Sequence, residues 1–433
     1  MAQLTLDELT PWLFSRTTGG IRWGLERTQE LLAGVDDPHR RFRSVHIGGT
    51  NGKGSVAALC DAVLRADGKM RVGLYTSPHL VSFRERIRVD GVPVADEVIV
   101  GAAETLRPAI GRTGASFFEA TTAMAFLIFA EQGVDVAVVE VGLGGRLDAT
   151  NVLTPAVTAI TNVAVDHEEY LGTSPAGIAA EKAGILKRGV PAISAVEGEE
   201  AREVLRSVAA REGAALYELA DLLTVDHVET GVHGASFEAF SKQWGRVKLR
   251  TSLTGSHQVA NATLALEIAG FLPDDIRPSI ASVQAGFEAC RWPGRLQVVE
   301  IHGTTYVLDV AHNPAGAQVL ASALEGLDLP RPIVCVAGIL SDKDWRSMLP
   351  TLSGEADALV LTTPPSAPTA RRWDLVQVEE WTVGRRLPRT RVIQNFDAAL
   401  SRATTMAPHG TVVVTGSVHT VGDAMDILGI DVV

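Results

Sequence analysis

Short apolar runs alternate along the chain with stretches whose apolar residues recur every three or four positions. The first pattern is typical of buried strands and the second of amphipathic helices. The expected strands lie at residues 45–47, 72–76, 134–141 and 157–165, and the expected helices at residues 55–66 and from Pro175. Gly68 can end the first helix, and Ser174 can cap the second. The alternation predicts a P-loop-type, mostly parallel sheet flanked by helices.

The second half of the chain repeats this rhythm after an interruption. Residues 215–253 show no helical period and predict extra strands and loops, followed by a helix at 256–270. Helical character stops near residues 290–295. Strands are then expected at 306–310, 333–337, 358–362, 392–393 and 412–415, and helices from Pro314 and from Asp397. Since single cores usually stop growing near ~250–300 residues, we predict two domains, residues 1–292 and a smaller, Rossmann-like α/β domain at 293–433.

Composition narrows the class of protein. The formal net charge of −12 argues against a nucleic-acid or anionic-membrane surface, although a local basic pocket is compatible with it. No apolar stretch approaches the ~20 residues of a membrane span. Three cysteines without metal-ligand spacing indicate reduced thiols, and the first residues lack a secretory pattern, so a cytoplasmic protein is expected.

A glycine-rich segment between a predicted strand and a predicted helix carries the first chemical signal. It reads Gly48-Gly49-Thr50-Asn51-Gly52-Lys53-Gly54-Ser55. Backbone N–H groups and the helix N-terminus can bind phosphate there, and Lys53 can neutralise its charge. The segment is not a strict Walker A motif, because Gly54 follows the lysine. Its other interpretation is a plain glycine-rich turn with an exposed lysine.

Eight segments in order resemble the folylpolyglutamate synthase/dihydrofolate synthase family of the Mur ligase superfamily. They are HIGGTNGKGS (46–55), YTSPHLVSFRERIRVDG (75–91), EVGLGGRLDATN (140–151), TNVAVDHEEYLG (161–172), IAAEKAGILK (178–187), HQVAN (257–261), WPGR (292–295) and LDVAHNP (308–314). The resemblance implies an ATP- and Mg²⁺-dependent ligase that joins L-glutamate to folate, and to dihydropteroate, through an acyl phosphate. It also favours a monomer, with these small molecules as its only partners.

Glu140 ends a predicted buried strand, where α/β sheets place their ligands and where a carboxylate suits Mg²⁺. The resemblance implies that Ser77, Glu140 and His167 bind the metal. It further implies that Lys182 is carbamylated and becomes an anionic metal ligand. From sequence alone, His167 and Lys182 would be a structural histidine and a solvated lysine.

The resemblance places the other wall of the nucleotide site on later segments. Asn261 corresponds to an adenine contact, and Arg295 and Asp309 to ATP-binding positions, for which a linker-surface arginine and a strand-end aspartate are the alternatives. Arginine suits phosphate and aspartate suits a ribose hydroxyl. His312 is implied to handle the incoming glutamate, and Ser417 is a further candidate for that pocket.

The folate end is implied by segments around residues 21–27 and 116–119. Ile21 and Arg22 precede Gly24-Leu25-Glu26-Arg27, whereas family members that also make dihydrofolate commonly carry an aspartate after the isoleucine. Further candidates for this end are Phe117, Phe118, Glu119, Leu147, Asp148 and Ala149. The two phenylalanines can stack on a flat ring or simply belong to the core. Arg84 and Arg86 can face an anionic substrate or solvent.

Two other functions remain at this stage. A peptidoglycan Mur ligase would share the phosphate loop but would normally add a domain before it for a UDP-sugar. A P-loop NTPase switch would bind nucleotide without a second domain carrying further site residues. Glutamate-dependent ADP release stimulated by a folate distinguishes the three.

Overall fold

The computed structural model of the chain describes residues 5–17, 23–385, 387 and 389–432. Its largest sheet has the strand order β4-β3-β2-β5-β1-β6-β7-β8. These strands are β1 (Arg43–Gly48), β2 (Val72–Tyr75), β3 (Ile87–Val89), β4 (Val92–Pro93), β5 (Val136–Glu140), β6 (Val157–Ile160), β7 (Pro191–Ser194) and β8 (Ala215–Glu218). All neighbours pair in parallel except β2-β3 and β3-β4. The predicted, mostly parallel sheet is therefore confirmed.

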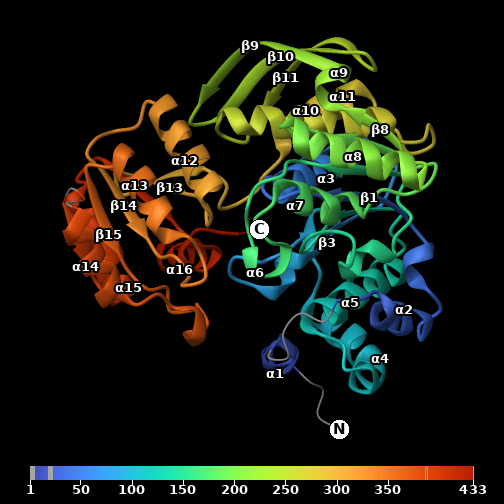
Figure 1. Cartoon of the computed structure of the whole chain (residues 1–433), viewed down its shortest axis with the longest axis horizontal. Helices are drawn as coiled ribbons and strands as arrows, with labels where there is room; N and C mark the ends of the chain where they lie inside the picture. Colours follow the sequence, from blue (N-terminus) through green and yellow to red (C-terminus); the bar gives the residue numbers. More distant parts are fainter. Residues whose placement is uncertain (1–4, 18–22, 386, 388, 433) are drawn as a thin grey trace.

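Helices cover both faces of this sheet (Figure 1). One face packs against α3 (Lys53–Asp67), α10 (Ser256–Phe271) and α11 (Ile280–Ala289). The other packs against α1 (Leu6–Phe14), α2 (Glu26–Ala33), α4 (Asp96–Thr113) and α5 (Phe117–Glu131). Near β6 and β7, the helices α7 (Pro175–Ala183) and α8 (Glu199–Glu212) bury a third apolar cluster. Burial on both faces explains why β5 is apolar up to Glu140, whereas β1, which is also buried after Arg43, carries Ser44 and His46 among its apolar residues.

A small antiparallel sheet lies on α10 and α11, as Figure 1 shows. It consists of β9 (Leu223–Gly231), β10 (Gly234–Ser241) and β11 (Gly245–Thr251). Extra strands were expected at residues 215–253, but the first of them, β8, joins the main sheet. The short elements of this part of the chain are η1 (Ser15–Thr17), η2 (Pro38–Arg40), η3 (Phe83–Arg86), η4 (Ala149–Val152), α6 (Glu168–Leu171) and α9 (Leu219–Leu222).

The C-terminal part forms a second, separate α/β lobe, orange to red in Figure 1. Its sheet order is β12-β13-β17-β14-β15-β16, with only β12 antiparallel to its neighbour. The strands are β12 (Gln297–Ile301), β13 (Thr304–Leu308), β14 (Ile333–Ala337), β15 (Ala358–Leu361), β16 (Thr390–Val392) and β17 (Thr411–Thr415). The helices are α12 (Pro314–Gly326), α13 (Trp345–Glu355), η5 (Thr369–Arg371), α14 (Leu375–Arg385), α15 (Phe396–Met406) and α16 (Val418–Leu428). Helices on both faces give the expected Rossmann-like arrangement.

Several details depart from the sequence prediction. The strand expected at 157–165 stops at Ile160, because the next residues leave the sheet and bind the glycine-rich loop instead. The helices at 96–113 and 117–131 were not predicted. In α5 nearly every side chain is buried, so its sequence shows no polar face to mark it as amphipathic. Within the described residues no helix is long and apolar enough to cross a membrane.

The core prediction concerns Phe129 of α5, which is fully buried against β2, where Gly73 leaves room for its ring. Replacing Phe129 by alanine leaves a cavity next to β2, and the surrounding backbone cannot collapse to fill it. We expect Phe129→Ala to lower the free energy of unfolding by about 3–5 kcal/mol. Chemical denaturation followed by circular dichroism measures this change. Val383→Ala, on a side chain that is 72% exposed, should be nearly neutral; equal effects of the two variants would contradict this packing.

Candidate active site

The glycine-rich loop connects β1 to α3, and two of its glycines adopt backbone conformations that other residues rarely reach. Gly49 has a φ of 141° and Gly52 a φ of 83°. A side chain at Gly49 would also overlap Thr161. Gly52 occupies the N-cap position of α3 without any side-chain cap. The first N–H groups of α3 are therefore available to an anion, as helix geometry and the helix dipole favour.

The segment after β6 holds this loop in place. Thr161 Oγ1 donates to the carbonyl of Asn51 at 2.6 Å, and the N–H of Asn51 donates to Asn162 Oδ1 at 2.9 Å. Thr50 Oγ1 donates to the carbonyl of Ala164 at 3.0 Å and accepts from its N–H. Lys53 Nζ lies 3.0 Å from the carbonyl of Thr50. The loop is thus fixed before any ligand arrives.

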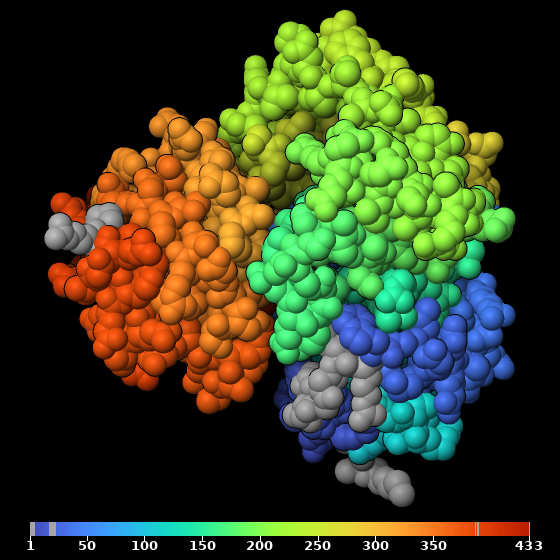
Figure 2. Space-filling model, viewed as in Figure 1, coloured from blue at the N-terminus to red at the C-terminus, as the bar shows by residue number. Residues whose placement is uncertain are grey.

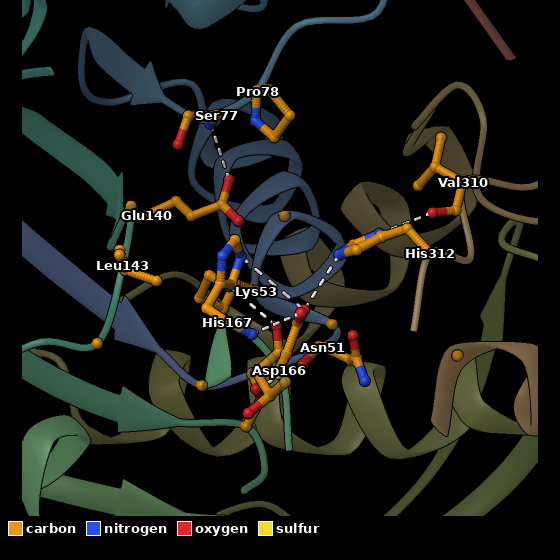
Figure 3. Close-up of a pocket in the computed structure, with 18 of the residues that line it drawn as sticks. Asn51, Lys53, Ser77, Pro78, Glu140, Leu143, Asp166, His167, Val310 and His312 are labelled. Carbon is orange, nitrogen blue, oxygen red and sulfur yellow. Dashed lines mark hydrogen bonds and ion pairs between the residues drawn. The ribbon is translucent and has the colours of Figure 1, made fainter. Parts of the chain in front are cut away.

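Glu140 ends β5 beside this loop, because β1 and β5 are parallel and Ile47 pairs with Glu140. Its Oε2 accepts the N–H of Ser77 at 3.1 Å (Figure 3). Burial raises the pKa of Glu140, and the positive charge of Lys53 opposes that rise. A cation near Glu140 would therefore favour its charged form.

Lys182, on α7, is a buried amine at the same cavity. Only 2% of Lys182 is exposed to solvent. Among the described residues, no hydrogen bond or ion pair engages its side chain. Burial, and then the charge of Lys53, lower the pKa of Lys182 to about 7. A large fraction of this lysine is therefore a neutral amine near neutral pH.

Asp166, which follows the loop-binding segment, joins the two lobes. Its Oδ1 lies 2.5 Å from Lys343 Nζ, and its Oδ2 accepts from Asn313 Nδ2 at 2.9 Å. His312 Nε2 lies 3.3 Å from Oδ2 (Figure 3). Burial alone would raise the pKa of Asp166, but His312 and Lys343 hold it far below its usual range. Asn313 also donates to Asn51 Oδ1 at 3.1 Å, which links the second lobe to the phosphate loop.

The linker between the lobes contributes Arg295, while Asp309 holds the linker in place. Asp309 Oδ2 accepts the N–H of Leu296 at 2.8 Å, and its Oδ1 accepts the N–H of Ala311 at 2.9 Å. On the other side, Asn261 of α10 lies against Gly52 and donates to Gln258 Oε1 at 2.9 Å. Burial lowers the pKa of Arg295, with Asp309 and Glu140 opposing that effect. Polar side chains from the linker and from α10 thus lie on both sides of the glycine-rich loop.

Aromatic residues mark the opposite end of the site. Phe117 is buried and stacks on Phe14 with ring centroids 4.7 Å apart. Phe118 lies against Gly142, where any side chain would overlap its ring. Glu119 is held by Arg27 at 2.9 Å and by the N–H of Ser116 at 2.7 Å. The carboxylate of Glu119 therefore fixes the start of α5.

Asp148 lies on the adjoining loop and binds its backbone. The N–H groups of Leu143 and Thr150 donate to it at 2.8 and 3.0 Å. Thr150 Oγ1 in turn lies 2.8 Å from Nε2 of the buried His46, which is on β1. Burial raises the pKa of Asp148, and Thr150 opposes that rise. Ile21 and Arg22, the remaining candidates for this end, lie outside the described residues.

A single cavity of about 870 Å³ connects all these groups. Figure 2 shows the groove between the orange lobe and the green lobe in which it lies. Of the site residues predicted from the sequence that the structure describes, all but Arg84 line this cavity: Thr50, Asn51, Gly52, Lys53, Gly54, Ser55, Ser77, Arg86, Phe117, Phe118, Glu119, Glu140, Leu147, Asp148, Ala149, His167, Lys182, Asn261, Arg295, Asp309, His312 and Ser417. Their individual roles remain predictions.

The cavity also contains residues that the sequence did not single out. Lys343 lies in a loop and Tyr170 in a single helical turn. Such short segments show no hydrophobic period that would mark either residue in the sequence. Trp23 lies 6.4 Å from Tyr170, ring centroid to ring centroid. Asp166 follows a predicted strand and lies in the segment TNVAVDHEEYLG (161–172), and these two positions were its only signals.

A phosphate-type loop in one lobe, facing cationic and amide groups from a second lobe, defines a two-domain enzyme that acts on a phosphorylated ligand. Residues 47–269 match the Mur ligase middle domain, and residues 294–418 match the Mur ligase glutamate ligase domain. The dihydrofolate synthase/folylpolyglutamate synthase of Bacillus subtilis is 37% identical over 357 residues, or 80% of this chain and 83% of that protein.

Solved structures show the same likeness over the whole length. The Mycobacterium tuberculosis folylpolyglutamate synthase complexed with ADP has a TM-score of 0.89 and 35% identity, and 99% of each chain is covered. A bifunctional folylpolyglutamate synthase/dihydrofolate synthase with Mn, AMPPNP and L-glutamate bound has a TM-score of 0.85 and 30% identity, with 99% coverage of both chains. The chain therefore belongs to the folylpolyglutamate synthase/dihydrofolate synthase family of Mur-type ATP-dependent ligases.

The contact between the lobes gives a testable prediction. Lys343→Met removes the cation that pairs with Asp166 and should shift the lobes toward separation. Since a lost charge-assisted hydrogen bond costs about 1.5–3 kcal/mol, we expect kcat/KM to fall about 10- to 100-fold. Steady-state kinetics measure the fall, and small-angle scattering should show a larger radius of gyration.

The matched control is Arg331→Met, which removes an exposed pair with Asp357 in the same lobe. It should change neither quantity. Unchanged kinetics and scattering in Lys343→Met would show that the Asp166 contacts do not hold the lobes together.

Proposed function

We propose that this chain joins the amino group of L-glutamate to the carboxylate of a folate or of dihydropteroate, at the expense of ATP. The observation that carries the proposal is the single cavity. It has a phosphate loop at one end, with cations that have no ion-pair partner in the described part of the chain, and aromatic side chains at the other end. That combination suits a ligand with a flat ring and a carboxylate, presented to a nucleoside triphosphate. The two relatives described above, one complexed with ADP and one with Mn, AMPPNP and L-glutamate, support it.

The phosphate end binds ATP in this proposal. The first N–H groups of α3, together with Thr50, Asn51, Gly54 and Ser55, surround the β- and γ-phosphates. Lys53 neutralises their charge, and Arg295 approaches from the linker. Asn261 contacts the adenine, and Asp309 the ribose. The loop needs little reorganisation because Thr161 and Asn162 already hold its backbone.

Ser77, Glu140 and His167 suit a magnesium ion shared with the phosphates. No group of three or more histidine, cysteine, aspartate or glutamate residues in the described part of the chain could hold a metal by itself. One carboxylate and one hydroxyl are nevertheless a suitable partial set for Mg²⁺, which usually keeps waters and phosphate oxygens as its other ligands. Burial lowers the pKa of His167 to about 4, so its imidazole is neutral, as a ligand requires. When bound, the ion would neutralise phosphate charge.

Lys182 supplies a further ligand in this proposal, as a carbamate. Its neutral amine attacks carbon dioxide, forms an N–C bond and releases one proton, which converts a potential cation into a carboxylate. The pKa of about 7 and the lack of a partner for Lys182 among the described residues favour this reaction. A carbamate would also remove the repulsion between Lys182 and Lys53.

The ligation proceeds in two steps. A carboxylate oxygen of the folate substrate attacks the γ-phosphorus, and the bond to the β-phosphate oxygen breaks, releasing ADP. The amino nitrogen of glutamate then attacks the acyl carbon, inorganic phosphate leaves, and the nitrogen loses a proton as the amide forms. His312 and Ser417 line the second lobe's side of the cavity, where they position the glutamate. Closure of the lobes through Asp166 excludes water from the acyl phosphate.

The aromatic end receives the pterin. Phe117 and Phe118 form one wall, Leu147 and Ala149 another, and Glu119 and Asp148 hold the adjoining backbone. The chain spans two domains in this account, 1–292 for ATP and folate and 293–433 for glutamate, and it acts as a cytoplasmic monomer. The match to the glutamate ligase domain, which begins at residue 294, supports that boundary.

Lys53→Ala tests the phosphate end. It removes the charge that neutralises the triphosphate, and we expect ADP release that depends on both folate and glutamate to fall at least ~10²-fold, with an unchanged circular dichroism spectrum. Lys69→Ala, at the other end of α3 and 64% exposed at its side chain, is the control and should keep full activity. Near-normal turnover of Lys53→Ala would refute the assignment of the loop.

The carbamate on Lys182 can be observed without turnover. With ¹³C-labelled bicarbonate, the wild-type protein should give a carbamate carbon resonance that Lys182→Ala lacks. Because only the neutral amine reacts, the signal should grow as pH rises through about 7, rather than near the ordinary lysine value. A signal that persists in Lys182→Ala, or its absence from wild-type protein at pH 8, would contradict the proposal.

A further inference from the structure

Arg86 is a buried cation that has no role in the proposed reaction as described above. It ends η3, is 6% exposed and lines the cavity. Its Nε donates to His79 Nδ1 at 2.8 Å, and its guanidinium lies 5.2 Å from the centroid of the Phe117 ring. Arg86 is therefore held in one orientation from two sides.

Arg84 shows that this placement is specific. It precedes Arg86 by two residues on the same short helix, yet its side chain is 41% exposed. Its Nε donates to the carbonyl of Val94 at 2.9 Å and lies 3.3 Å from Asp96. Arg84 does not line the cavity. From the sequence, both arginines were candidates for contact with an anionic substrate. The fold places only Arg86 in the cavity.

The terminal nitrogens of Arg86 lack an anion. Across the described residues, no ion pair and no hydrogen bond engages either of them. The adjacent Glu85 binds the N–H groups of residues 80–82, so its carboxylate is already occupied. A guanidinium remains charged in proteins, and burying it without a partner is costly. Its two-pronged donor group matches a carboxylate or a phosphate.

The position of Arg86 decides which anion it meets. Its guanidinium lies against the Phe117 ring, at the aromatic end of the cavity, and it interacts electrostatically with Glu140 without forming an ion pair with it. The phosphate loop already has Lys53 and the N-terminus of α3. The anion expected next to Arg86 therefore lies between the ring-binding end and the phosphate end. In a substrate whose ring occupies the aromatic end, that anion is the carboxylate.

We propose that Arg86 binds the substrate carboxylate that is about to be phosphorylated, and so makes the site specific for an acid. This inference rests on the proposed function and names a residue for its acceptor side. A bidentate pair with Arg86 directs one carboxylate oxygen toward the γ-phosphate. His79 positions Arg86 without touching the substrate.

Binding without turnover tests the proposal. Isothermal titration calorimetry with AMPPNP and Mg²⁺ present compares dihydropteroate with its carboxamide, which has the same shape but no charge. Wild-type protein should bind the acid about 10- to 100-fold more tightly, as expected for a charge-assisted bidentate pair. Arg86→Met should bind both compounds with the amide's affinity, Arg86→Lys should retain part of the preference, and Arg84→Met should match wild type.

The outcomes separate the inference from the function. If Arg86→Met keeps the wild-type preference for the acid, or if it loses AMPPNP affinity instead, Arg86 does not bind the carboxylate. If wild-type protein binds neither these two compounds nor tetrahydrofolate, the proposed function fails and the inference fails with it. Thermal unfolding of each variant checks the fold, and Arg86→Lys, which keeps the charge, tests the pairing even if Arg86→Met is unstable.

Discussion

The central physical constraint in this protein is a concentration of basic side chains around one cavity. Lys53, Arg86, Lys182 and Arg295 all line it, and among the described residues none of them has an ion-pair partner within 4.0 Å. Cations that are removed from water without a partner are costly, so these side chains favour an anionic ligand. The chain as a whole carries a net charge of −12, which makes this concentration of cations a local feature. Triphosphate, carboxylate and carbamate groups would each relieve part of the repulsion.

The fold generates this cavity from simple elements. Parallel strands bring the ends of β1, β5 and β6 to one edge, and the glycine conformations at Gly49 and Gly52 turn the N-terminus of α3 toward it. The second lobe then closes over the same edge through Asp166, which pairs with Lys343 and with His312. Phosphoryl transfer needs positioning and charge neutralisation more than covalent help from the protein. The arrangement supplies both.

Much of this could be predicted from sequence, because strand ends and glycine turns leave local patterns. The loop at 48–55, Glu140 after an apolar run and the second α/β rhythm are such patterns, and the fold class is confirmed. The rest depends on contacts between distant residues. Nothing local distinguishes Arg86 from Arg84, since their separation arises from the packing of η3 against His79 and Phe117. Lys343 can be recognised as a site residue only through its contact with Asp166, which is 177 positions away in the sequence. The buried α5 hides its helical period because all its faces are apolar.

The most direct test of the central claim follows oxygen atoms through the reaction. Dihydropteroate labelled with ¹⁸O in its carboxylate is incubated with ATP, L-glutamate and the enzyme, and the inorganic phosphate is analysed by mass spectrometry. If the cationic cavity activates the carboxylate by phosphoryl transfer, each phosphate released by ligation carries one ¹⁸O from the substrate. Unlabelled phosphate, formed together with labelled amide product, would show that the carboxylate is never phosphorylated and would contradict the account.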